Sequence, residues 1–99
     1  MAMYVLMTRL AAGALESSEG RKKMGREWLK KVRKRVPGVK FKAHYAIFGP
    51  YDFMDVFEVD TPESAQRVAL ISRSEGAVSV ETWQAVPYDD FLKLLDSVD

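Results

Sequence analysis

The order of strand-like and helix-like segments is the feature that most limits the folds open to this chain. Strands are predicted where apolar residues alternate with a period of two, and helices where they recur every three to four residues. Glycine and proline pairs separate several segments, as at Pro37-Gly38 and Gly49-Pro50. The first half of the chain is predicted to form a strand (3–9), a loop (11–20), a helix (20–36) and a strand (39–48). The second half is predicted to form a strand (51–59), a helix (61–74), a strand (77–86) and a short terminal helix (88–95).

This βαββαβ order predicts an α+β fold of the ferredoxin-like type, with a short C-terminal helix added. Right-handed crossovers make a split βαβ arrangement the simplest one for this order. Residues 1–99 form one domain, since domains typically hold about 100–150 residues. Two helices on one face leave the other face of the sheet bare, and large apolar groups remain there in either register. We therefore expect that face to pack against a second copy of the chain.

The 20–36 helix has a sharply divided surface. Its apolar residues fall within an arc of about 140°, and Gly25 lies in the middle of that arc. Because glycine in a helix costs about 1 kcal/mol relative to alanine, Gly25 indicates either a close approach to the sheet or room for a ligand. The opposite side carries six basic residues: Lys22, Lys23, Arg26, Lys30, Arg33 and Lys34.

Charge is distributed unevenly along the chain. Residues 1–49 contain twelve Lys and Arg against three Asp and Glu, whereas residues 50–99 contain three against eleven. This asymmetry indicates an anionic ligand, pairing within the chain or complementary subunits. The basic helix face has no interleaved aromatic residues and no phosphate-binding loop, so we interpret it as a solvated surface and expect no nucleic-acid partner.

The composition also bears on location. The chain has no cysteine, which rules out disulfides, thiolate metal sites and cysteine nucleophiles. Residues 1–9 have no basic leader or small-residue cleavage site, and their apolar run is too short to span a bilayer. We therefore expect a cytoplasmic protein with no membrane association.

His44 is the only histidine. One imidazole cannot form a typical zinc site, and no acidic or histidine cluster stands near it in sequence, so no metal and no cofactor are expected. Alternation along the 39–48 strand places Phe41 and Tyr45 on one face and His44 on the other. As a general base, His44 needs a nearby orienting group. The alternative is an ordinary strand histidine.

Asp55 is the second candidate for chemistry. It shares a strand face with three aromatic residues, Tyr51, Phe53 and Phe57. An unpaired charge on such a face is expensive. We therefore expect that Asp55 either forms a salt bridge with Arg9, Arg73 or a residue of another subunit, or has a raised pKa and serves a site.

The hairpin Gly49-Pro50-Tyr51-Asp52, followed by the segment Gly76-Ala77-Val78-Ser79-Val80-Glu81-Thr82, resembles the GYD-domain family. That family is similar to the dimeric α/β-barrel proteins, so the resemblance implies a homodimer. The same two pieces are similar to the effector-binding domain of the leucine-responsive (feast/famine) regulators, which bind amino acids or similar small effectors between subunits. No DNA-binding helix-turn-helix precedes the domain here, so this second resemblance implies a stand-alone sensing module.

The leading functional hypothesis is a small-molecule-binding or regulatory module that acts as a homodimer or larger assembly. By resemblance to the effector-binding domains, its pocket is expected at a subunit boundary near Tyr51, Asp52, Asp55 and the segment 76–82. A plain assembly domain without a ligand is a further possibility.

The competing hypothesis is a cofactor-independent enzyme of the oxygenase or isomerase type, with its pocket between the helices and the sheet. His44 and Asp55 are its candidate acid–base groups. The sequence has no nucleophile–base pair, so an enzymatic role rests on analogy with the superfamily. Trp28, Tyr45 and Trp83 are the expected walls of that pocket. The residues expected to contact a ligand under one hypothesis or the other are Trp28, Tyr45, Tyr51, Asp52, Glu81 and Trp83.

Overall fold

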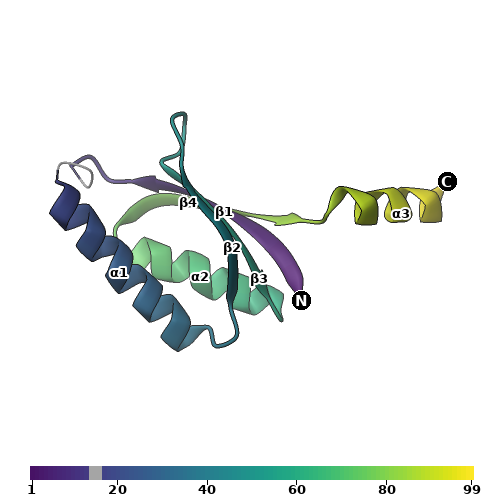
Figure 1. The fold of residues 1–99 in the computed structure, drawn as a ribbon, viewed down its shortest axis with the longest axis horizontal. Helices are drawn as coiled ribbons and strands as arrows, with labels where there is room; N and C mark the ends of the chain where they lie inside the picture. The colour runs from purple at the N-terminus through teal and green to yellow at the C-terminus, as the bar shows by residue number, and fades with distance from the viewer. Residues whose placement is uncertain (14–16) are drawn as a thin grey trace.

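A computed structural model describes residues 1–13 and 17–99, and Figure 1 shows its ribbon. The observed order of elements is the predicted one. The loop expected over residues 11–20 lies partly outside the described residues. The elements are β1 (Ala2–Leu10), α1 (Ser18–Arg35), β2 (Lys40–Ala46), β3 (Phe53–Val59), α2 (Pro62–Ser74), β4 (Ala77–Ala85) and α3 (Tyr88–Val98).

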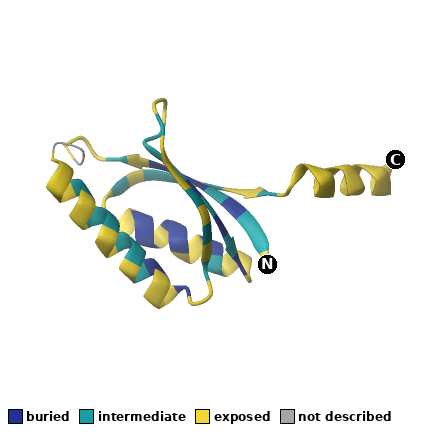
Figure 2. Cartoon of the chain, in the orientation of Figure 1, coloured by how far each residue is buried: buried dark blue, intermediate teal, exposed yellow. Residues whose placement is uncertain are grey.

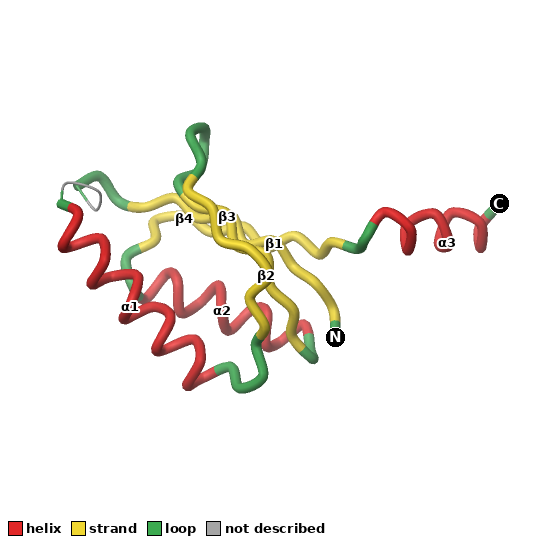
Figure 3. The backbone as a smooth tube through the Cα atoms, viewed as in Figure 1, coloured by secondary structure: helices red, strands yellow, loops and turns green. Residues whose placement is uncertain are grey.

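The four strands form one antiparallel sheet in the order β2-β3-β1-β4. With α1 and α2 on the same face, this topology confirms the predicted ferredoxin-like fold (Figures 1 and 3). The core lies between the sheet and the two helices, where Figure 2 shows the buried segments. Its fully buried larger side chains are Leu6, Val32, Val36, Phe57, Val59 and Val68.

Local signals place the ends of both core helices. The Ser17 side chain caps α1 by accepting a hydrogen bond from the backbone N–H of Gly20, and Thr61 caps α2 by accepting one from Ser64. Gly76 follows α2 with φ of +109°, a backbone conformation that side chains other than glycine's rarely adopt. A Cβ at this position would lie 3.1 Å from Cε of Met24, so Gly76 also permits close packing against α1.

The register of β2 against β3 contains an irregularity that sequence alternation did not predict. Phe41 lies opposite Phe57, but Ala43 lies opposite Val56, so β2 carries one extra residue between these pairs. A bulge of this kind changes the direction in which the following side chains point. The prediction that Phe41 and Tyr45 share a face opposite His44 is therefore wrong. Phe41 and His44 both face the helices, and Tyr45 faces the other way.

The second face of the sheet carries no helix among the described residues, as Figure 3 shows. Residues paired across antiparallel strands share a face, so Val56, Val5 and Trp83 form one row on it. Tyr45, Met54 and Met7 form the next row. Trp83 is 47% exposed and Tyr45 is 56% exposed. The expected bare apolar face is thus present.

The terminal helix α3 extends away from the rest of the molecule (Figure 1). In the part of the chain that the structure describes, it makes no contact with another helix or strand, and none of its residues is buried. No helix among the described residues is both long enough and apolar enough to cross a membrane.

Candidate functional site

His44 and Asp55 lie opposite each other on β2 and β3, on the sheet face that the helices cover. Their side chains are hydrogen-bonded through His44 Nδ1 and Asp55 Oδ1. Asp55 is only 3% exposed, whereas about half of the His44 side chain remains accessible to solvent. A buried carboxyl group therefore holds a half-exposed imidazole.

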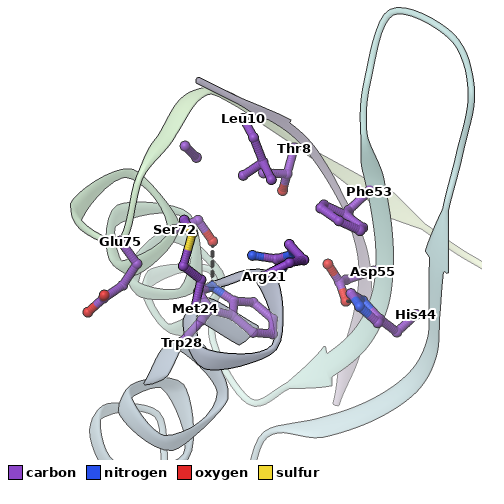
Figure 4. Close-up of a pocket in the computed structure, with 11 residues that line it drawn as sticks. Thr8, Leu10, Arg21, Met24, Trp28, His44, Phe53, Asp55, Ser72 and Glu75 are labelled. Atoms are coloured by element: carbon purple, nitrogen blue, oxygen red, sulfur yellow. Dashed lines mark hydrogen bonds and ion pairs between the residues drawn. The ribbon is translucent and has the colours of Figure 1, made fainter. Parts of the chain in front are cut away.

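Arg21 enters the same space from the first turns of α1, as Figure 4 shows. Its guanidinium carbon lies 4.6 Å from the centre of the Phe53 ring, within the range of a cation–π interaction. Sequence reasoning missed this residue among the many basic ones of α1. Its spacing was a usable signal, because Arg21 precedes Met24 by three positions and Trp28 by seven and thus lies on the apolar stripe.

Burial and neighbouring charges shift the pKa values of Asp55 and Arg21 in opposite directions. Burial raises the pKa of Asp55, and the neighbouring His44 and Arg21 only partly offset this increase. Burial likewise lowers the pKa of Arg21, an effect that the Asp55 carboxylate opposes. Asp55 and Arg21 are therefore partly desolvated groups of opposite charge that act on each other.

The partners of Asp55 differ from the expected ones. His44 and Arg21 interact with Asp55, in place of Arg9 or Arg73. Arg9 donates a hydrogen bond from Nε to the carbonyl oxygen of Pro50 at 2.8 Å and lies over the Tyr51 ring. The expected salt bridges to Arg9 and Arg73 are thus wrong, and burial raises the pKa of the Asp55 carboxyl.

Two hollows adjoin the cluster and share Arg21, Trp28, His44 and Asp55 in their linings. A small inner cavity of about 40 Å³ extends between α1, α2 and the sheet, and its polar lining includes Thr8, Arg21, His44, Asp55 and Ser72. A larger open groove of about 430 Å³ lies between α1 and β2. We define the α1–β2 groove by its lining: Arg21, Lys22, Gly25, Arg26, Trp28, Leu29, Arg33, Phe41, His44 and Asp55.

Trp28 forms the wall between the two hollows. Its Nε1 donates a hydrogen bond to Ser72 Oγ at 2.8 Å, and Ser72 in turn donates to the carbonyl oxygen of Val68. Its ring also packs against Phe41, with ring centres 5.5 Å apart. Gly25 lines the groove, where an added Cβ would meet only the Arg21 side chain at 3.8 Å. Gly25 thus leaves open room, and a close approach to the sheet is not its role.

The remaining candidate residues lie elsewhere. Tyr45, Trp83 and Glu81 belong to the face without helices, so the expectation that Tyr45 and Trp83 wall a pocket with His44 is wrong. Tyr51 packs edge-on against Trp83, with ring centres 6.3 Å apart. Of the residues expected to contact a ligand, Trp28 alone lines the hollows around His44 and Asp55.

Among residues 1–13 and 17–99, no group of three or more histidine, cysteine or acidic side chains is placed to hold a metal ion. The chemistry available at the cluster is that of hydrogen bonding, charge and proton exchange. Arg21 and protonated His44 can bind an anion, and His44 oriented by Asp55 can exchange a proton.

Comparison with known proteins identifies the family. The GYD domain family matches residues 4–95. The chain belongs to the GYD domain family. This confirms the resemblance seen in the 49–52 hairpin and the 76–82 segment, and it applies to nearly the whole chain.

One relative of this GYD domain is the "glutamine synthetase and cystathionine beta-lyase binding protein" of Thermus thermophilus, with 38% identity over 58 residues. The match covers 59% of this chain and 61% of the relative. Among solved structures, TTHA0845 from Thermus thermophilus has a TM-score of 0.61 at 19% identity, covering 88% of this chain and 95% of that one. The hypothetical protein PHS023 from Pyrococcus horikoshii has a TM-score of 0.54 at 21% identity, covering 88% and 92%. These structural likenesses establish the shared fold.

The hairpin at residues 49–52 has a structural role. The backbone N–H of Leu10 donates to Oδ2 of Asp52 at 2.8 Å, and the N–H of Asp52 donates to the carbonyl oxygen of Thr8 at 2.8 Å. These bonds tie the hairpin to the end of β1. Asp52 thereby fixes the β2–β3 connection to the end of β1, the strand whose Thr8 lines the inner cavity.

Proposed function

We propose that this GYD domain is a small-molecule-binding regulatory module that acts as a homodimer, and that its ligand is a small organic anion with an apolar part. The observation that carries the proposal is the cluster of Arg21, His44 and Asp55, which lines a groove together with the apolar side chains of Trp28, Leu29 and Phe41. A volume of about 430 Å³ lies within the range of small-molecule sites.

The lining of the groove favours an anion. Arg21 at its floor is joined by Lys22, Arg26 and Arg33, whereas Asp55 is the one acidic residue of the lining. A carboxylate can accept paired hydrogen bonds from the guanidinium of Arg21. The rings of Trp28 and Phe41 offer an apolar surface for the rest of the ligand.

The face of the sheet without helices supports the homodimer. Trp83 and Tyr45 are about half exposed there, next to aliphatic residues of the central strands. Glu58 and Glu81 lie on the same face, and large exposed aromatic side chains next to charged ones are typical of an interface. The resemblance to the effector-binding domains supports the same interpretation, because those domains bind effectors between assembled subunits.

The name of the Thermus relative supports a binding role over a structural one. That protein is described as binding two enzymes, glutamine synthetase and cystathionine beta-lyase. For this chain we propose the corresponding general behaviour, in which a ligand-responsive dimer contacts another protein.

Native mass spectrometry of the purified protein tests the assembly and any retained ligand together. A dimer, with or without added mass, agrees with the proposal, and a monomer contradicts the homodimer. Thermal unfolding with a panel of aromatic and aliphatic carboxylates, and with their methyl esters, then tests the ligand class. At least one carboxylate should raise the Tm of the protein, while its uncharged ester should not.

The matched variants for this test are Arg21→Gln and Arg73→Gln. Arg73 is an exposed arginine of α2 that lies outside both hollows around the cluster. The Tm increase should persist in Arg73→Gln and disappear in Arg21→Gln. An equal increase in both variants would place the ligand somewhere other than the α1–β2 groove.

A cofactor-independent enzyme is the second candidate, and the hydrogen bond between His44 and Asp55 favours it. A carboxylate bonded to Nδ1 orients an imidazole so that Nε2 can act as a general base. An enzyme would convert a groove ligand, and His44→Gln would abolish turnover while leaving the fold intact. A regulator would release the same ligand unchanged, as mass spectrometry of the released compound can determine.

A further inference from the structure

The helix α3 has the features of a docking element without a partner in its own chain. Its eleven residues place Tyr88, Phe91, Leu92 and Leu95 on one stripe by their i, i+3, i+4, i+7 spacing. Phe91 is 46% exposed and Leu95 is 49% exposed. Helices shorter than about 12–15 residues are marginal in water, so α3 needs a surface to stabilise it.

The charge of α3 is strongly biased. Asp89 and Asp96 flank its apolar stripe on one side, Asp90 lies on the far side of the helix, and Lys93 is the one basic residue of the helix. Acidic residues in the first turn stabilise a helix by themselves. Asp96 stands in the last turns, however, where that reason does not apply.

The α1–β2 groove has the complementary character. Its floor includes the apolar side chains of Trp28, Leu29 and Phe41, and Lys22, Arg26 and Arg33 line it as well. The surface at Gly25 is free of a side chain, which lets another backbone come close. An amphipathic acidic helix fits such a groove through an apolar stripe and basic rims.

The helix α3 does not occupy the groove of its own chain. The groove borders β2, at one edge of the sheet, whereas α3 follows β4 at the other edge. Figure 1 shows α3 extending away from the sheet, and among the described residues it contacts no other helix or strand. The helix α2 packs against β4 and β1 on the intervening surface.

We propose that α3 of one copy docks across the α1–β2 groove of a second copy, with its acidic residues against Lys22, Arg26 and Arg33. The inference rests on the homodimer of the proposed function and adds a defined contact between the copies. In this arrangement α3 covers the outer part of the groove, and the cluster of Arg21, His44 and Asp55 becomes enclosed by residues of both subunits. The site is therefore complete only in the assembly.

Cross-linking of single-cysteine variants tests this contact, because the chain has no cysteine of its own. A Lys93→Cys variant reports on α3, a tagged Lys22→Cys variant on the groove, and a tagged Arg73→Cys variant on the α2–β4 side as the matched control. Each tagged variant is mixed with Lys93→Cys, allowed to exchange subunits and treated with a short bismaleimide. Covalent heterodimers should form with Lys22→Cys in several-fold excess over those with Arg73→Cys.

Charge reversal provides the second measurement. Asp89→Lys with Asp96→Lys should lower the Lys93–Lys22 cross-linking yield several-fold, and Arg26→Glu with Arg33→Glu should do the same. Subunits carrying the two reversed sets should cross-link to each other with the yield restored. Failure of this rescue overturns the inference.

The outcomes separate the inference from the function on which it rests. Equal cross-linking to the groove and to the control position, or none in a protein that native mass spectrometry finds dimeric, overturns α3 docking and leaves the homodimer standing. A monomer overturns both. The carboxylate-dependent Tm increase is measured independently, so its loss contradicts the ligand proposal and not the helix contact.

Discussion

His44 and Asp55 face each other across β2 and β3 because β2 carries a bulge between Phe41 and Ala43. Without that extra residue, a strand that places Phe41 against the core would turn His44 to the opposite face. The bulge therefore does two things at once: Phe41 packs on Trp28, and His44 reaches the buried carboxylate. Bulges next to functional sites commonly serve to re-aim a side chain in this way.

The pH dependence of stability should report on Asp55. Its pKa is raised by burial, so the folded state favours the protonated carboxyl more than the unfolded chain does. The resulting stability is fully present below the ordinary Asp pKa of about 3.9 and is lost as the pH rises through the raised value. The free energy of unfolding of wild type should therefore fall relative to Asp55→Asn over this window. Urea unfolding at a series of pH values measures the difference, and a relative gain for wild type would indicate a lowered pKa.

Arg21 should influence the titration of Asp55 directly. The guanidinium favours the ionised carboxylate, so its removal in Arg21→Gln should raise the Asp55 pKa further. The carboxyl carbon shift of Asp55, followed by NMR against pH, measures this change. In Arg73→Gln, the matched exposed arginine, the titration should stay as in wild type. An unchanged pKa in Arg21→Gln would mean that the guanidinium does not act on Asp55 in solution.

The hydrogen bond from Trp28 to Ser72 should contribute to stability. Ser72 is 4% exposed, and its replacement by alanine leaves the indole N–H without its acceptor. We expect Ser72→Ala to lower the free energy of unfolding by about 1–3 kcal/mol. Ser18→Ala is the control at the exposed first residue of α1, with an expected change within about 0.5 kcal/mol. Chemical denaturation measures the free energy of unfolding of both variants. Equal losses in the two would show that the indole hydrogen bond does not contribute to stability.

Gly76 and Gly49 allow a matched test of backbone strain. At Gly76 the φ is +109° and an added methyl meets Met24, whereas Gly49 has neither a positive φ nor an atom within 4 Å of an added Cβ. Gly76→Ala should destabilise the fold by at least about 1–2 kcal/mol. Gly49→Ala should change stability by less than about 0.5 kcal/mol. Thermal unfolding measures both, and a tolerated Gly76→Ala would show that the turn relaxes freely.

Much of the fold could be predicted because its signals are local. The capping residues Ser17 and Thr61, the Pro37-Gly38 stop and the change between periods of two and 3.6 each depend on neighbours in sequence. These signals give the order of the elements. The order and right-handed crossovers then give the ferredoxin-like topology.

The site could be predicted only in part because its geometry depends on register. Asp55 was identifiable as a charge on an aromatic strand face. Its pairing with His44, however, depends on the bulge in β2, which no local residue pattern predicted. The same strict alternation placed Tyr45 with Phe41, and nothing in the sequence showed that Trp28 and Trp83 lie on opposite sides of the sheet. Arg21 was hidden among other basic residues, although its helical spacing indicated the buried stripe.

The exposed face of the sheet gives the last prediction. Trp83 and Gln84 are neighbours on β4 and point to opposite faces, since Trp83 pairs with Val5 and Gln84 with Tyr4. If two copies pack through the face without helices, a carboxylate at Trp83 must be buried without a partner. Trp83→Glu should therefore shift the protein from dimer to monomer in sedimentation velocity, with far-UV circular dichroism unchanged. Gln84→Glu adds the same charge one residue away on the other face and should remain dimeric. A dimer that tolerates Trp83→Glu would contradict sheet-to-sheet assembly.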